Sequence, residues 1–245
     1  MGFGIWGNDR MKEERLSLRK EIKYIVPMAK AVLIRNCLDR LLARDAYCAD
    51  GAYSVRSLYM ESVNNTDFSE KIAGTSHRKK VRLRIYNNET SLCKLEIKEK
   101  QGEWQYKQSI LVEESDAKEI MAGHYGVLKS YFQDAGTGLK AYKIMQQGHY
   151  RPAVLIEYER MAYRYPMYDT RITIDGNIRA SESCLSLWDT GGSYSPVSYE
   201  NAILEIKYSG KLMGFISAAL AQFNLEQSAY SKYCAGRRAY FDFDY

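Results

Sequence analysis

Charged and apolar residues alternate strictly in several short segments of this 245-residue chain. Successive side chains point to opposite faces of a β-strand, so Arg82 and Arg84 would share one face while Leu83 lies on the other. The same spacing places on one face of later strands Lys94, Glu96, Lys98 and Lys100, then Arg171, Thr173 and Asp175, and then Glu205 and Lys207. The pattern predicts strands with one apolar face and one charged face.

The charged faces carry a repeated signature, the tripeptide Glu-Ile-Lys, which begins at Glu21, Glu96 and Glu205. A half-buried sheet with a solvated charged face would account for any one of these strands. The repetition favours a different arrangement, and so does the excess of basic residues, which cross-strand ion pairs would leave unneutralised. We therefore predict an inside-out barrel whose charged interior binds a polyanion. Its carboxylates are the oxygen ligands that Mg²⁺ or Mn²⁺ prefers.

The remaining periodicity predicts a single α+β domain. Strands are predicted over residues 18–26, 53–60, 79–86, 92–100, 105–112, 151–160, 171–178 and 202–208. Helices are predicted over 28–44 and 139–147, from Ser115 onward, within 64–74 and in segments up to 240, whereas 181–199 is predicted to be a loop. The predicted fold is an antiparallel β-barrel of about eight strands, forming a charged tunnel with helices packed outside. It spans 18–240, between an N-terminal extension, 1–17, and a tail, 241–245.

Composition limits the function classes. Lysine and arginine number 35 against 30 acidic residues, a formal charge of +5, which is a small excess for a nucleic-acid binder. The five cysteines are scattered without the short spacings of a zinc or redox motif, as is typical of a reducing compartment. No apolar run approaches the roughly 20 residues that a membrane span needs. We expect a cytoplasmic protein without a transmembrane segment of its own.

Several segments, taken in order, resemble a known family. They are Arg19-Lys20-Glu21-Ile22-Lys23-Tyr24, Tyr53-Ser54-Val55-Arg56-Ser57-Leu58-Tyr59, Glu70-Lys71-Ile72-Ala73-Gly74, Arg82-Leu83-Arg84, Leu95-Glu96-Ile97-Lys98, Tyr158-Glu159-Arg160, Arg171-Ile172-Thr173-Ile174-Asp175, Leu204-Glu205-Ile206-Lys207-Tyr208 and Ser231-Lys232-Tyr233. Together they resemble the VTC catalytic domain, the polyphosphate polymerase of the vacuolar transporter chaperone complex and its bacterial relatives. That domain belongs to the triphosphate tunnel metalloenzymes, also called the CYTH superfamily.

The resemblance implies an ATP:polyphosphate phosphotransferase that uses Mn²⁺ or Mg²⁺ and transfers the γ-phosphate of ATP to a growing polyphosphate chain. It implies catalytic roles for Lys23, Arg82, Arg84, Lys98 and Arg160, substrate binding by Arg151, Lys107, Arg171, Lys207 and Lys232, and metal binding by Glu205, with Glu21 and Glu96 as further carboxylates. Arg19 stands where the wider superfamily carries the first of two glutamates. That departure matches the polymerase branch and counts against an ordinary triphosphatase.

Two alternatives stay open at this point. The first is a tunnel triphosphatase that hydrolyses triphosphate or a nucleoside triphosphate, and the second is a non-catalytic module that binds polyphosphate or inositol phosphates. Whether a separate membrane protein takes up the product also stays open. Three isolated histidines, His77, His124 and His149, indicate no site, and we interpret the basic run Arg78-Lys79-Lys80 as a solvated segment at the tunnel mouth.

Overall fold

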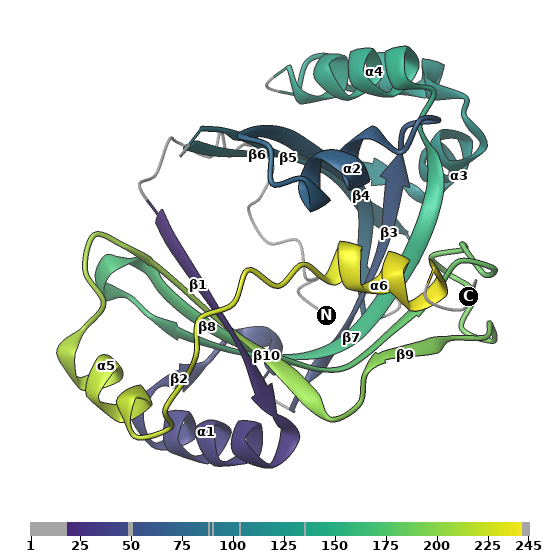
Figure 1. Ribbon diagram of the computed structural model, residues 1–245. Helices are drawn as coiled ribbons and strands as arrows, with labels where there is room; N and C mark the ends of the chain where they lie inside the picture. Colours follow the sequence, from purple (N-terminus) through teal and green to yellow (C-terminus); the bar gives the residue numbers. More distant parts are fainter. Residues whose placement is uncertain are drawn as a thin grey trace.

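Eight strands form one continuous path in an antiparallel sheet (Figure 1). The computed structural model describes residues 19–48, 51–87, 89, 91–102, 104–134 and 136–241. The order is β1 (Arg19–Pro27), β10 (Asn201–Ser209), β8 (Thr170–Ser181), β7 (Arg151–Tyr165), β3 (Tyr53–Glu61), β4 (His77–Tyr86), β5 (Leu92–Gln101) and β6 (Trp104–Glu113). Two short strands lie beside this path, β2 (Ala43–Arg44) on β7 and β9 (Ser195–Ser198) on β8.

The sheet curls into a half-barrel, as the path of the ribbon in Figure 1 shows. Its end strands are β1 and β6, and the side chains of β1 and β5 meet across the concave side, where Lys98 Nζ lies 3.1 Å from Glu21 Oε2. The predicted antiparallel, barrel-like architecture of about eight strands is therefore confirmed. It follows from the alternation, because an apolar face on every strand requires a covering layer on one side only.

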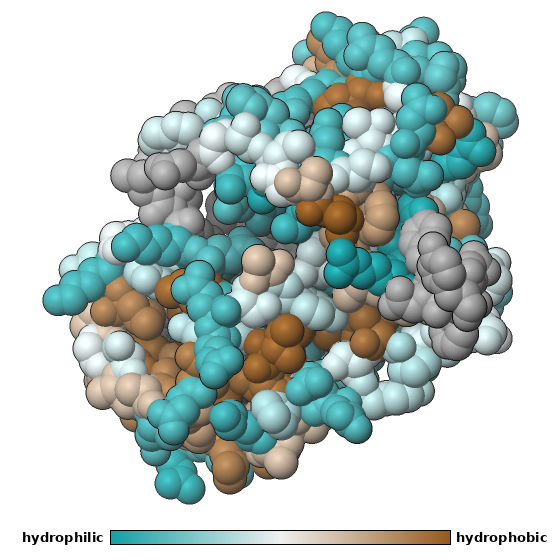
Figure 2. All heavy atoms as spheres, in the orientation of Figure 1, coloured by the Kyte–Doolittle hydropathy of each residue, from teal (hydrophilic) through white to brown (hydrophobic). Residues whose placement is uncertain are grey.

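Helices cover the convex face. α1 (Met28–Leu41) and α5 (Gly214–Ala221) lie over β1, β8 and β10, whereas α3 (Glu114–Ala122), α4 (Thr137–Gly148) and the 3₁₀ helix Tyr125–Tyr131 lie over β3 to β6. Under α3 and α4, Leu83 and Leu95 pack with Ile120 and Met145, all fully buried. Two more 3₁₀ turns, Ala46–Cys48 and Met167–Asp169, complete the regular structure that is described. In the view of Figure 2, hydrophobic residues gather around α1 and α5.

One helix, α6 (Lys232–Phe241), lies on the concave side instead. The Tyr233 ring stacks on that of Tyr59 with centroids 4.9 Å apart, and Cys234 joins a buried cluster with Ile156. A Cβ atom at Gly236 would lie 2.8 Å from Ile156 Cδ1, so the glycine permits this close approach. The helix α6 also contacts α2 (Thr66–Ile72). It fills part of the concave side and leaves the rest to charged residues.

The structure corrects some predicted boundaries. The helix predicted over 28–44 ends at Leu41, and Ala43–Arg44 pairs with β7 instead. The predicted loop over 181–199 contains β9, and buried Arg56 holds this segment, since its Nη2 donates to the Ser186 carbonyl oxygen at 3.4 Å. The predicted extension, 1–17, lies outside the described residues. Across the part of the chain that is described, every helix is too short or too polar to span a membrane.

Candidate functional site

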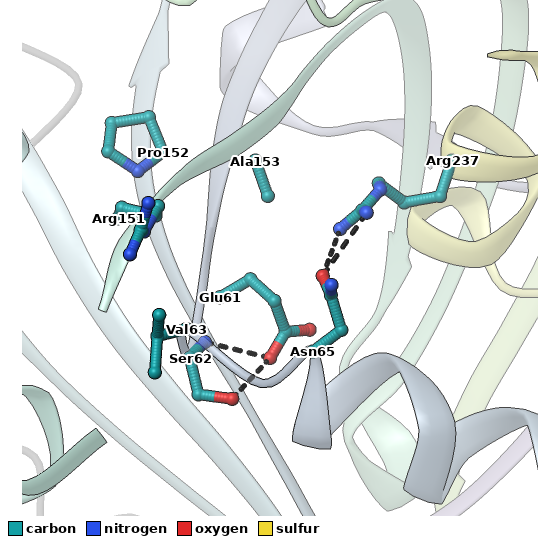
Figure 3. A pocket seen from close by; sticks show the side chains of 8 residues that line it. All are labelled: Glu61, Ser62, Val63, Asn65, Arg151, Pro152, Ala153 and Arg237. Carbon is teal, nitrogen blue, oxygen red and sulfur yellow. Dashed lines mark hydrogen bonds between the residues drawn. The ribbon is translucent and has the colours of Figure 1, made fainter. Parts of the chain in front are cut away.

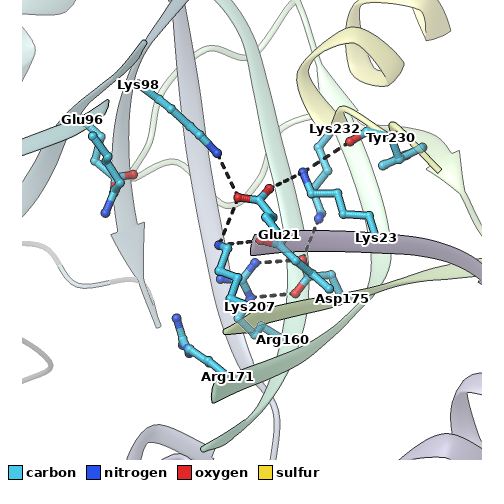
Figure 4. A network of polar contacts seen from close by, with 12 residues as sticks. Glu21, Lys23, Glu96, Lys98, Arg160, Arg171, Asp175, Lys207, Tyr230 and Lys232 are labelled. Atoms are coloured by element: carbon cyan, nitrogen blue, oxygen red, sulfur yellow. Dashed lines mark hydrogen bonds and ion pairs between the residues drawn. The ribbon is translucent and has the colours of Figure 1, made fainter. Parts of the chain in front are cut away.

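The register of the sheet brings the charged residues of distant strands onto its concave face. Lys23 of β1 is opposite Glu205 of β10, and Glu21 is opposite Lys207. Glu205 is in turn opposite Thr173 of β8. Directly opposed residues in an antiparallel pair share a face, so the three strands contribute to one polar network (Figure 4).

The first part of the network surrounds two carboxylates. Glu21 Oε1 lies 2.9 Å from Lys23 Nζ, and its Oε2 lies 3.1 Å from Lys98 Nζ. Lys207 Nζ lies 2.5 Å from Glu205 Oε1 and 4.0 Å from Glu21 Oε2, so this ammonium bridges both acids. Three lysines from three strands thus converge on two glutamates from the paired strands β1 and β10.

The lysines keep both carboxylates ionised. Burial by itself raises the pKa of Glu21, but the attraction of Lys207, Lys98 and Lys23 outweighs burial and lowers it to about 2. Repulsion between Glu21 and Glu205 acts against this shift in the pKa of Glu21. Burial likewise raises the pKa of Glu205, and the lysines, with Lys207 first among them, hold it well below its usual range.

A third carboxylate, Glu96 of β5, is buried among three cations. Its Oε2 lies 2.7 Å from Arg82 Nε and 3.6 Å from Arg84 Nη1, and its Oε1 lies 3.0 Å from Lys107 Nζ. Arg84 Nε also donates to Ser57 Oγ at 2.9 Å, which fixes the guanidinium on the concave side. Burial raises the pKa of Glu96, and the three cations together lower it well below the ordinary value.

A fourth carboxylate, Asp175 of β8, is fully buried and orients two more cations. Arg160 of β7 makes a two-pronged contact, with Nε at 2.7 Å from Oδ1 and Nη2 at 2.8 Å from Oδ2. Lys232, the first residue of α6, lies 2.6 Å from the same Oδ2. Burial raises the pKa of Asp175, but Arg160 and Lys232 lower it to about 2, so the acid remains charged.

Two polar atoms of β8 lack a hydrogen-bond partner within the described residues. They are Arg171 Nε and Thr173 Oγ1, both buried. Arg171 is held by Tyr53 Oη at 3.1 Å and by Asp45 Oδ2 at 3.4 Å. Since buried polar groups are nearly always satisfied, these free positions next to Lys207 and Glu205 are consistent with a ligand in the site.

Nearly all residues that the sequence singled out share this concave face. They are Lys23, Arg82, Arg84, Lys98, Lys107, Arg160, Arg171, Lys207 and Lys232, with Glu21, Glu96 and Glu205. Arg151 lies apart from them. It is exposed at the start of β7 and lines a separate cavity of ≈ 270 Å³ beside Glu61, Asn65 and Arg237 (Figure 3).

One further lysine lies on this face. The basic run Arg78-Lys79-Lys80 predicts a solvated segment, but Lys80 Nζ donates to Ser231 Oγ at 2.7 Å on the concave side. Its neighbour Lys79 points the other way and lies 3.1 Å from the buried Asp67. The alternation of Lys80 with Arg82 and Arg84 was the signal that could have separated the two lysines.

The carboxylates can be compared with what a divalent metal requires. Mg²⁺ commonly binds one or two carboxylates and completes its shell with substrate phosphates and water. Glu21 and Glu205 supply such a pair from the adjacent strands β1 and β10, and lysines contact both of them. Glu96, by contrast, is a single carboxylate among three cations. Within the described ranges no group of three or more His, Cys, Asp or Glu side chains could hold a metal by itself. The residues therefore fit a metal that shares its ligands with a phosphate substrate.

Solved structures with a similar fold include a candidate adenylate cyclase from Bacillus halodurans. It superposes with a TM-score of 0.51 at 11% identity, covering 88% of this chain and 94% of that one. A Pyrococcus horikoshii protein gives 0.47 at 12% identity, with 91% and 99% covered. No curated protein matches the chain. At such low identity, the similarity to the Bacillus protein shows a shared fold and nothing finer.

The sequence also matches a family model. The model of the VTC domain covers residues 18–241, which include every strand and helix described above. The match agrees with the curled antiparallel sheet and with the charged concave face. The chain therefore belongs to the VTC domain family.

Proposed function

We propose that this protein is a metal-dependent polyphosphate polymerase, which transfers the γ-phosphoryl group of ATP to the end of a polyphosphate chain. The observation that supports this most is the convergence of cations from seven elements, β1, β4, β5, β6, β7, β10 and α6, around a few carboxylates. Membership of the VTC family and a tunnel-type fold support phosphoryl transfer as the reaction class.

The charge imbalance supports a polyanionic ligand. Buried cations in one small volume repel one another, and the available carboxylates do not neutralise them all. Burial and the neighbouring Lys207 and Lys23 lower the pKa of Lys98, although Glu21 is in contact with it. A linear run of phosphates would relieve this repulsion along the whole face.

The residues suit phosphoryl transfer more than covalent catalysis. Arg82, Arg84 and Arg160 present planar guanidinium forks that match phosphate oxygens. A terminal phosphate oxygen of the chain attacks the γ-phosphorus, the bond to the β-phosphate oxygen breaks, and ADP leaves with that electron pair. The attacking phosphate is already ionised, so positioning and charge stabilisation suffice.

Glu205 and Glu21 would hold the divalent ion, Mn²⁺ or Mg²⁺. When bound, the ion supplies positive charge to phosphate oxygens beside the lysines. The proposal places the protein in the cytoplasm, where ATP is supplied. The free thiols of Cys37, Cys48, Cys93, Cys184 and Cys234 agree with a reducing compartment. Polyphosphate is the product, and a separate membrane protein would be its acceptor.

The test is incubation of the pure protein with γ-labelled ATP and Mn²⁺, followed by gel electrophoresis of the products. We expect the label in acid-labile chains and stoichiometric formation of ADP, both lost when the divalent ion is chelated. Label that appears only as orthophosphate would identify a triphosphatase. ATP that binds but is not consumed with Mn²⁺, Mg²⁺ or Co²⁺ would identify a binding module.

A further inference from the structure

Lys80, which is partly exposed, differs from the other lysines of the concave face. Lys23, Lys98, Lys207 and Lys232 each contact a carboxylate. Within the part of the chain that the structure describes, Lys80 contacts none. Among the described residues, the one polar contact of its ammonium group is the hydrogen bond to Ser231 Oγ at 2.7 Å.

Aromatic rings and other cations surround this ammonium group. Lys80 Nζ lies 5.3 Å from the centroid of the Tyr233 ring, which itself stacks on Tyr59. Among the side chains that act on it, Tyr59 and Cys234 favour its charged form, whereas Lys71 of α2 and Lys23 of β1 are cations that repel it. Burial lowers the pKa of Lys80 to about 8, and repulsion from these two lysines adds to the effect.

Such an arrangement is costly without a ligand. A buried charge is stable only when it is paired or well hydrogen-bonded, and one hydroxyl and one ring are weak partners for an ammonium group. An anion in front of Lys80 would supply the missing partner. The position of Lys80 on the same face of β4 as Arg82 directs that anion toward the network described above.

We propose that Lys80 is a substrate-contacting residue, which binds one phosphoryl group of the chain at the α6 end of the concave face. This inference rests on the proposed function, because it assumes that the ligand is a phosphate chain. Residues two apart on a strand are separated by roughly 6.6 Å. Lys80 and Arg82 therefore suit a ligand with several linked phosphates better than orthophosphate.

Calorimetric titration with inorganic tripolyphosphate tests the inference without any turnover. Lys80→Met should weaken binding about ten- to a hundredfold, the usual effect of losing a charged hydrogen bond. Lys80→Arg should retain most of the affinity. Lys143→Met is the matched control, because it removes the same charge from an exposed position on α4 and should leave affinity unchanged.

The pH dependence gives a second measurement. Other groups near Lys80 also carry or change charge: Tyr59 of β3, Lys98 opposite it on β5, Lys71 of α2, Lys23 of β1, and Tyr233 and Cys234 of α6. Tyr59 matters most, because burial raises its pKa while Arg82 and Lys80 bring it down to about 8. Affinity should fall as the pH rises from 7 to 9.5, and the fall should be smaller in Lys80→Arg, which stays charged.

Unchanged affinity of Lys80→Met, or a loss equal to that of Lys143→Met, would overturn the inference. A misfolded Lys80→Met protein would show in its thermal melt, and Lys80→Arg would then decide by its pH profile. An unaltered profile in that variant would also overturn it. Because no ATP is present, failure of the polymerase assay leaves this result standing, and a negative result here leaves the polymerase proposal standing.

Discussion

The two faces of β4 carry opposite chemistry within a few residues. Val81, Leu83 and Ile85 point to the convex face and are fully buried under helices, whereas Arg82 and Arg84 point to the concave face. Burial of one such aliphatic side chain contributes about 1.5–3 kcal/mol to folding. Buried ion pairs roughly break even against their desolvation. The convex face therefore stabilises the fold, and we propose that the concave face serves binding.

The largest effect on activity should come from substitution of Glu205, the proposed metal ligand on the concave face. Glu205→Gln keeps the shape of the side chain but removes the charge that would hold a divalent ion, which costs several kcal/mol of transition-state stabilisation. We expect turnover of ATP to fall by about a thousandfold or more, while binding of tripolyphosphate is largely kept. Rates with labelled ATP measure turnover, and calorimetry measures the binding of tripolyphosphate.

The exposed Glu200 on the turn before β10 provides the control, and Glu200→Gln should behave like the wild type. Full activity of Glu205→Gln would instead assign the metal to Glu21 or Glu96.

A substitution on the convex face should change the free energy of unfolding and not the activity. Leu83→Ala removes a fully buried side chain from the core under α3 and α4. We expect a loss of about 2–5 kcal/mol in the free energy of unfolding, measured in urea, with the activity of the folded fraction unchanged. A fall in the activity of folded Leu83→Ala protein would show that the two faces are coupled.

The same alternation decided how much could be predicted. It located all eight strands of the main path and the charged face, because period-two patterning is a local property. The position of α6 could not be predicted, since it depends on the Tyr233–Tyr59 stack between distant segments. Lys80 was misassigned because a run of basic residues obscures the alternation. The location of Arg151 depends on a bulge where β7 pairs with Met60, which no periodicity reveals.

Asp67 is a buried carboxylate outside the network, and its pKa is shifted in the opposite direction to that of Glu21 or Asp175. Its contribution to stability should therefore fall as the pH rises. Burial raises the pKa of Asp67 to about 6 from the ordinary value of 3.8, although Lys79 lowers it in part. The folded state thus holds this proton more tightly than the unfolded state. Stability from this group is greatest below pH 3.8 and is lost as the pH rises through about 6, by about 3 kcal/mol in total.

In Asp67→Asn, the decline in unfolding free energy between pH 4 and 6 should therefore be flatter than in the wild type, as measured in urea. Asp134→Asn, at an exposed position, should retain the wild-type slope. An identical slope in Asp67→Asn would show that Lys79 keeps Asp67 ionised. Asp175 cannot cause the decline, because its pKa of about 2 keeps it charged over this range.

The smallest effect concerns individual arginines. Arg82 contacts Glu96 and the hydroxyl of Tyr59 on the concave face, whereas Arg151 lies in the separate cavity beside Glu61. Arg82→Ala should weaken tripolyphosphate binding about ten- to a hundredfold. Arg82→Lys should recover only part of this loss, because an ammonium group lacks the planar fork. Arg151→Ala should change affinity by less than about twofold, since this exposed side chain lines the separate cavity and salt screens exposed charges. Calorimetry of the three variants ranks their affinities directly.

If Arg151→Ala loses as much affinity as Arg82→Ala, the phosphate chain extends past α6 into that cavity. The division of the molecule into one binding face and one structural face would then have to be redrawn.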